Sequence, residues 1–78
     1  MLNMQEEKKK MESLRLKVYE LDLREIEKEL LLQYINASLG SLLNELNYTY
    51  YKGFIQGILM TLLSCDKLSH PQYVELKI

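Results

Sequence analysis

The chain has 78 residues, with 10 Lys and Arg against 11 Asp and Glu, so its net charge is −1. This balance gives no field that would draw the whole molecule onto DNA or an anionic membrane. A chain this short forms one domain at most. Because a single core of this size yields only about 3 to 5 kcal/mol, association with another chain is a natural source of stability.

The first half of the chain carries a heptad pattern. Mostly apolar residues recur at the a and d positions, which places them on one seam of an α-helix and requires another helix to cover them. The predicted oligomer seam comprises Met11, Leu14, Val18, Leu21, Glu25, Lys28, Leu32, Ile35, Leu39 and Leu42. This seam predicts a first helix over about residues 3–46.

The position of the first turn is open between residues 36 and 47, where Asn, Ser and Gly accumulate. One interpretation ends the helix at Gly40 and lets Ser41 cap the next helix. We prefer the other, because the seam stays in register through Leu39, Leu42 and Leu46 and favours a turn near Asn47. A second helix then covers about residues 48–65, and residues 1–66 form a helical hairpin.

Two patterns mark the second helix. One is an apolar stripe that begins at Tyr48 and includes Ile55 and Leu62. The other is a small-residue stripe at three- and four-residue spacing, formed by Gly53, Gly57, Thr61 and Ser64. Glycine inside a helix costs roughly 1 kcal/mol relative to alanine, so this stripe suggests close approach of another helix backbone.

The short tail, residues 67–78, permits two structures. Ser69 followed by Pro71 and Gln72 is typical of a capped helix start. Val74, Leu76 and Ile78 alternate with charged residues, which is typical of a strand.

The hairpin geometry predicts an oligomer. An eighteen-residue second helix covers only the last part of the first helix, and the projecting part carries a second apolar stripe almost opposite the seam. We therefore expect an all-α protein, a long helical hairpin that forms a coiled-coil-like or bundle-type homodimer or higher oligomer. The candidate partner-binding residues are Leu16, Tyr19, Leu23, Ile26 and Leu30, with Tyr48, Tyr50 and Tyr51 near the turn.

The break in the heptads suggests an antiparallel register for two copies of the seam. Pairing Glu25 with Lys28 of a second copy matches apolar with apolar residues in the neighbouring layers, for example Val18 with Ile35. A buried ion pair adds little stability but can fix register. The alternative is that Glu25 and Lys28 simply pair within one solvated helix.

The residues that carry chemistry are sparse. His70 and Cys65 are the only histidine and cysteine, so no Cys/His metal set exists, and no glycine-rich phosphate loop or catalytic motif is present. We expect neither an enzyme nor a cofactor. A single cysteine and a charged N-terminus without an apolar h-region predict a cytoplasmic protein. The longest apolar run, residues 54–63, is too short for a membrane span.

The predicted function is a non-enzymatic protein–protein interaction module that acts by stoichiometric binding, such as a small regulator, inhibitor or adaptor. Proteins of this kind from phages and mobile elements often have this size. The first alternative is a small DNA-binding or transcription-associated factor, although acidic residues interrupt the basic ones along the first helix. The second alternative is a structural scaffold component. The expected partners are a second copy and an unidentified protein, and we do not expect nucleic acid.

Overall fold

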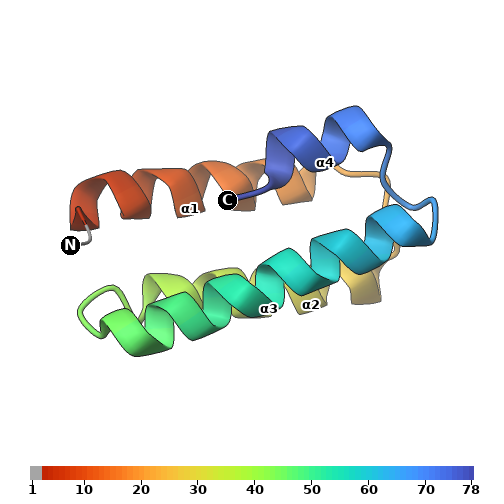
Figure 1. Cartoon of the computed structure of the whole chain (residues 1–78). Helices are drawn as coiled ribbons and strands as arrows, with labels where there is room; N and C mark the ends of the chain where they lie inside the picture. Colours follow the sequence, from red (N-terminus) through yellow and green to blue (C-terminus); the bar gives the residue numbers. More distant parts are fainter. Residues whose placement is uncertain (1–2) are drawn as a thin grey trace.

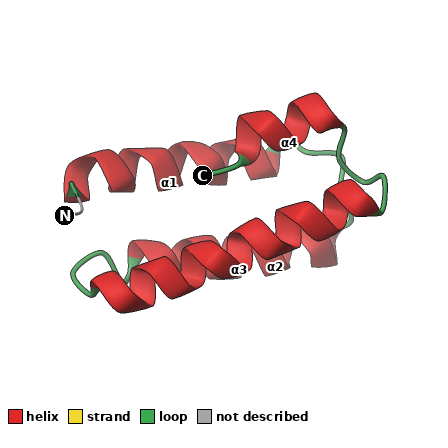
Figure 2. Cartoon of the chain, in the orientation of Figure 1, coloured by secondary structure: helices red, strands yellow, loops and turns green. Residues whose placement is uncertain are grey.

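The computed structural model describes residues 3–78 and contains four helices: α1 (Met4–Tyr19), α2 (Glu25–Leu39), α3 (Glu45–Ser64) and α4 (His70–Leu76). The first three run in alternating directions, and the short α4 folds back beside the end of α1 (Figure 1). Figure 2 shows that loops join the helices and that the part of the chain drawn in detail contains no strand. The all-α prediction is confirmed at this level.

A single core runs between the helices. It contains the most deeply buried side chains of α1, α2 and α3, and Leu68 and Leu76 close it beside α4. The core of α1 to α3 consists of Met11, Leu14, Val18, Leu31, Ile35, Tyr48, Ile55, Leu59 and Leu62. The heptad seam therefore faces the interior of one chain over much of its length.

The predicted helix over residues 3–46 is not continuous. It breaks at residues 20–24, where Arg24 adopts extended backbone and its N–H donates to Glu27 Oε1 at 3.0 Å, so that α2 starts afresh. No Gly or Pro marks this break. The physical reason is tertiary packing. Because the chain reverses here, Val18 and Leu14 of α1 join the same core as Ile35 of α2, whereas a straight helix would leave these side chains exposed.

The second turn also lies earlier than the preferred interpretation placed it. α2 ends at Leu39 with Gly40 as its C-cap, and residues 41–43 form the turn. The Asn44 side chain, not that of Ser41, accepts a hydrogen bond from the backbone N–H of Asn47 at 3.2 Å and caps α3. A side-chain acceptor satisfies one of the free N–H groups of a helix start, and this local gain decides the position of the turn.

α4 begins as its cap residues predict. Ser69 Oγ accepts from the Gln72 N–H at 3.2 Å, and Gln72 Oε1 accepts from the Ser69 N–H at 2.8 Å, which is a reciprocal capping box. The strand alternative is wrong for residues 70–76. Lys17 Nζ lies 3.9 Å from Glu75 Oε1 and connects α4 with α1.

The end of α3 uses a left-handed residue without glycine. Asp66 has φ of 59°, the Asp66 N–H bonds to Leu63 O, and the Lys67 N–H bonds to Leu62 O at 2.8 Å, which together form a Schellman motif. Because glycine adopts this conformation without a Cβ penalty, Asp66→Gly should raise the free energy of unfolding by about 0.5 to 1 kcal/mol. Urea unfolding followed by circular dichroism measures this change in the free energy of unfolding. An unchanged or lower unfolding midpoint would contradict a cost of the left-handed conformation at Asp66.

Candidate protein-binding surface

The face of α3 that points away from the core is uncharged and exposed. We call it the α3 outer face and define it by six exposed positions: Leu46, Tyr50, Gly53, Gly57, Met60 and Ser64. Leu46 is 84% exposed, Tyr50 63% and Met60 54%. Large apolar side chains gathered on one helix face without a neighbour are typical of interaction sites, whereas single ones are ordinary.

An open groove of about 850 Å³ lies along one side of this face, where α3 meets α2. Its walls are mostly apolar. The lining residues come from both helices and are Glu27, Leu30, Thr49, Tyr50, Gly53, Phe54, Gly57, Ile58, Thr61 and Leu62. The two glycines widen the groove because they add no side chain to its floor.

Aromatic rings hold the edge of the groove in place. Tyr34 of α2 stacks on Phe54 of α3 with ring centroids 4.9 Å apart and planes at 9°. Tyr50 meets Phe54 edge-on at 4.8 Å and also contacts Tyr51 at 5.8 Å. Such pairs contribute about 0.5 to 1.5 kcal/mol beyond their burial, so they stabilise this arrangement of the side chains at the edge of the groove.

The predicted close approach at the small-residue stripe does not occur within one chain. A Cβ added at Gly53 or at Gly57 would find no described atom within 4 Å apart from its own helix and chain neighbours. In the isolated fold these two glycines therefore cost helix propensity and gain no packing.

The charge nearest the groove is neutralised locally. Glu27 accepts a hydrogen bond from the Arg24 N–H, and the Arg24 guanidinium Nε lies 3.4 Å from the same Oε1 atom. The backbone bond first, and then the guanidinium, hold the pKa of Glu27 below its usual value. The groove therefore presents an apolar surface with its single lining carboxylate, among the described residues, already paired.

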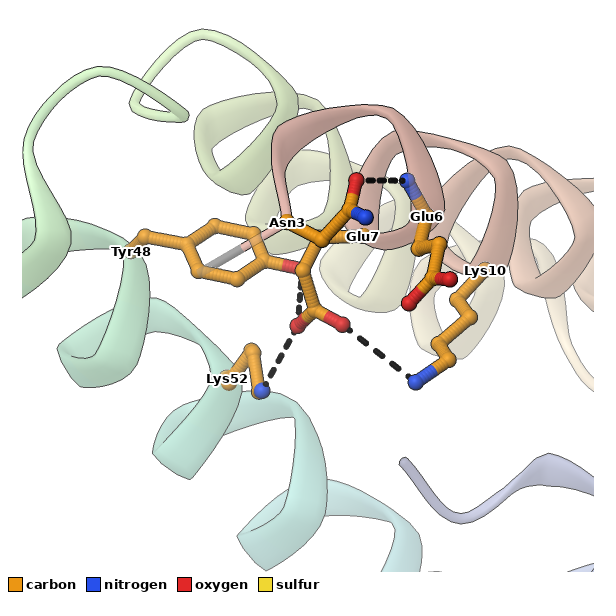
Figure 3. Close-up of polar contacts among 6 residues, drawn as sticks. All are labelled: Asn3, Glu6, Glu7, Lys10, Tyr48 and Lys52. Atoms are coloured by element: carbon orange, nitrogen blue, oxygen red, sulfur yellow. Dashed lines mark hydrogen bonds and ion pairs between the residues drawn. The ribbon is translucent and has the colours of Figure 1, made fainter. Parts of the chain in front are cut away.

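A polar cluster on another side of α3 fixes the N-terminal end of α1 (Figure 3). Glu7 Oε1 accepts from Tyr48 Oη at 3.1 Å and lies 3.0 Å from Lys52 Nζ, while Lys10 Nζ lies 3.4 Å from Oε2. Lys52 also sits 5.1 Å from the centre of the Tyr48 ring. This cluster joins α1 to α3.

The pKa values of this cluster follow from its contacts. Burial tends to raise the pKa of Glu7, but Lys52, Tyr48 and Lys10 together bring it below its ordinary value. Burial, and then the Glu7 charge and hydrogen bond, raise the pKa of Tyr48. Both residues are therefore held in one protonation state at neutral pH, which suits a structural link.

Glu7→Gln should lower the free energy of unfolding at pH 7 by about 1 kcal/mol, because it removes a charge-assisted bond at a partly solvated site. The ionised Glu7 stabilises the fold above its unfolded pKa, near 4.5, and this contribution is lost as the pH falls through the lower folded value. The difference from the wild type should therefore shrink towards pH 3. Glu6→Gln, at an exposed neighbour, is the control. A constant difference from pH 7 to pH 3 would contradict the ionic origin.

The predicted oligomer seam is divided among several environments. Met11, Leu14, Val18 and Ile35 are fully buried within one chain, and the partly buried Leu21, Leu32, Leu39 and Leu42 pack against the same core. Glu25 is exposed, and Lys28 Nζ donates to the Tyr19 carbonyl at 3.1 Å. The buried members are covered by the chain's own helices, so they are not available to a second copy in this fold.

The predicted partner-binding residues are also separated. Leu16 (67% exposed), Tyr19 (59%) and Ile26 (67%) lie on surfaces outside the groove lining, and Leu23 is partly buried in the first turn. Leu30 and Tyr50 line the groove, Tyr51 is half-buried beside it, and Tyr48 is in the core. Leu30 and Tyr50 thus come together at the candidate site.

Sequence reasoning missed Phe54 and Met60, and it assigned Leu46 to the seam of the first helix instead of to this face. Their signal is present: positions 46, 50, 53, 57, 60 and 64 follow the 4-3 spacing of a second heptad seam. This second spacing is easily overlooked beside the stripe through Tyr48 and Ile55, because that stripe is more apolar and forms the core side of the same helix.

The comparisons add no relative. Neither protein-family models, nor curated proteins, nor solved structures match the chain. Within residues 3–78, no helix is long and apolar enough to cross a membrane. The same residues hold no group of three or more His, Cys, Asp or Glu side chains placed to bind a metal ion.

Proposed function

We propose that this chain is a non-enzymatic protein–protein interaction module that acts by stoichiometric binding through the α3 outer face and the adjoining groove. The observation that carries the proposal is the open, largely apolar groove between α2 and α3, about 850 Å³ in volume, whose lining carboxylate Glu27 is paired with Arg24 and whose edge carries exposed Tyr50 and Phe54. An amphipathic helix docks into such a groove by laying its apolar side chains along it.

The physical gain comes from desolvation. Covering apolar surface is worth roughly 25 cal/mol per Å², and a partner helix would not have to strip water from any unpaired charge in this groove. Tyr50 is suited to anchor the complex, because tyrosine offers a large contact area at low entropy cost and is enriched at binding hot spots. A regulator, inhibitor or adaptor that acts by stoichiometric binding needs only such a binding surface.

Paired substitutions test the proposal. Met60→Arg places a charge on the α3 outer face, whereas Leu16→Arg places the same charge at an exposed position of α1. With tagged chains expressed in the native host, Met60→Arg should lose a captured protein that the wild type and Leu16→Arg retain, and the purified partner should bind at a fixed molar ratio. Equal capture by both variants would contradict this surface. Salt-dependent binding to DNA unaffected by Met60→Arg would favour a DNA-binding factor instead.

A further inference from the structure

The α3 outer face is a heptad seam with internal symmetry. Its six positions are spaced 4, 3, 4, 3 and 4 residues apart, and all six are exposed in the fold. The spacing is the same read in either direction about Ile55. In an antiparallel pair of helices a positions meet d positions, so this seam can pair with a second copy of itself with a match in every layer.

The layers of that pairing are chemically compatible. Gly53 meets Gly57 of the second copy at the centre, which lets the two backbones approach at the short end of the usual 8 to 10 Å range. Tyr50 meets Met60 in the next layer, and sulfur next to an aromatic ring is a favourable contact. Leu46 meets Ser64 at the ends. No layer contains a charge.

The exposed area suits a second copy. The chain exposes 5393 Å², whereas a compact monomer of 9.3 kDa exposes about 5,000 Å². At about 200 Å² per large side chain, the exposed fractions of Leu46, Tyr50 and Met60 leave about 400 Å² of surface on the α3 outer face, and Leu30 and Phe54 add about 170 Å² in the adjoining groove. A stable interface buries about 800 Å² per partner. The apolar side chains supply most of this area, and the exposed backbone of Gly53 and Gly57 adds to it.

Charges at the two ends of α3 select the antiparallel orientation. Glu45 starts the helix and Lys67 follows its end, and both are exposed. In the antiparallel register Glu45 faces position 65 of the second copy, beside Asp66 and Lys67, whose opposite charges offset each other, and the two Glu45 carboxylates lie at opposite ends of the pair. A parallel pair would place Glu45 next to Glu45 and Lys67 next to Lys67, and like charges disfavour that arrangement.

We propose that the α3 outer face binds the same face of a second copy, forming an antiparallel α3–α3 homodimer centred on Gly53 and Gly57. The inference rests on the proposed function, since it names the occupant of the same protein-binding surface. The close backbone approach that the sequence predicts for these glycines then occurs between chains, where it offsets their cost in helix propensity.

The oligomeric state provides the first test. Light scattering at micromolar concentration should give twice the 9.3 kDa chain mass. Gly57→Leu should raise the dissociation constant by about 5- to 150-fold, because overpacking a close contact costs about 1 to 3 kcal/mol. Its helical content should persist, since the single chain leaves this position open. Gln5→Leu, on exposed α1 surface, should leave the dimer intact. A monomeric wild type, or a Gly57→Leu dimer of unchanged affinity, would overturn the proposal.

The orientation provides the second test. A Tyr50→Cys copy is mixed with a separately tagged Met60→Cys copy, both carrying Cys65→Ser, and the mixture is mildly oxidised. Disulfides joining the two different copies support the antiparallel register, whereas dimers linked through two copies of position 50 overturn it. If the wild type is monomeric and Met60→Arg still abolishes capture of another protein, the homodimer is rejected while the proposed function stands.

Discussion

Leu14→Asp is expected to unfold the protein, whereas Leu16→Asp, two residues along the same helix, is expected to be tolerated. Leu14 is 3% exposed in the core and Leu16 is 67% exposed. An unpaired carboxylate in the core costs several kcal/mol, which is comparable to the about 3 to 5 kcal/mol that a single core of this size yields. Circular dichroism at 25 °C should show loss of the helical signal for Leu14→Asp alone.

Comparing Leu14→Asp with Leu16→Asp distinguishes two descriptions of α1. The sequence predicts a projecting helix with two apolar faces that other chains cover, whereas the structure buries one face against the chain's own helices. Equal tolerance of aspartate at positions 14 and 16 would contradict the single-chain core. Equal loss of folding would show that the face of Leu16 is also covered.

Ile35→Ala should lower the free energy of unfolding by about 2 to 5 kcal/mol, because Ile35 is fully buried between α1 and α3 and its truncation leaves a cavity. The matched control is Ile26→Ala, which changes the same residue type on the same helix where the side chain is 67% exposed. That control should stay within about 0.5 kcal/mol of the wild type. Urea unfolding of both variants measures the difference. Losses of unfolding free energy of similar size would show that Ile35 is not a core residue.

The sequence predicts the helices of this fold better than the loops between them. The Ser69 cap and Gln72 identify the start of α4, because that motif acts locally and needs no tertiary partner. The turn at residues 20–24 contains no Gly or Pro, and the heptad spacing continues through it from Val18 to Glu25. The local contacts between Arg24 and Glu27 start α2 here, and the gain from folding α1 back onto α2 favours the break, but a pattern read along one helix does not contain that gain.

The candidate site was predictable in part for a related reason. Gly53 and Gly57 attract attention in the sequence because glycine is costly inside a helix. Met60 does not, because an apolar residue in an apolar helix is assigned to the core by default, and the heptad spacing assigns Leu46 to the first helix. Both sides of α3 carry heptad spacing, and only the packing of Ile55 and Leu59 against the other helices shows which side is exposed.

Hydroxyl-radical footprinting tests most directly whether the α3 outer face is where this chain meets another protein. Tyr50 and Met60 report on that face, while Tyr19 and Met4, which are 59% and 43% exposed, report on α1. At micromolar concentration, or in complex with a captured partner, oxidation of Tyr50 and Met60 should be several-fold slower than in the Gly57→Leu chain. Oxidation of Tyr50 should also be several-fold slower than in the Met60→Arg chain, and oxidation of Tyr19 and Met4 should be unchanged. Full oxidation of Tyr50 and Met60 with protection of Tyr19 would place the binding surface on α1 and contradict the account.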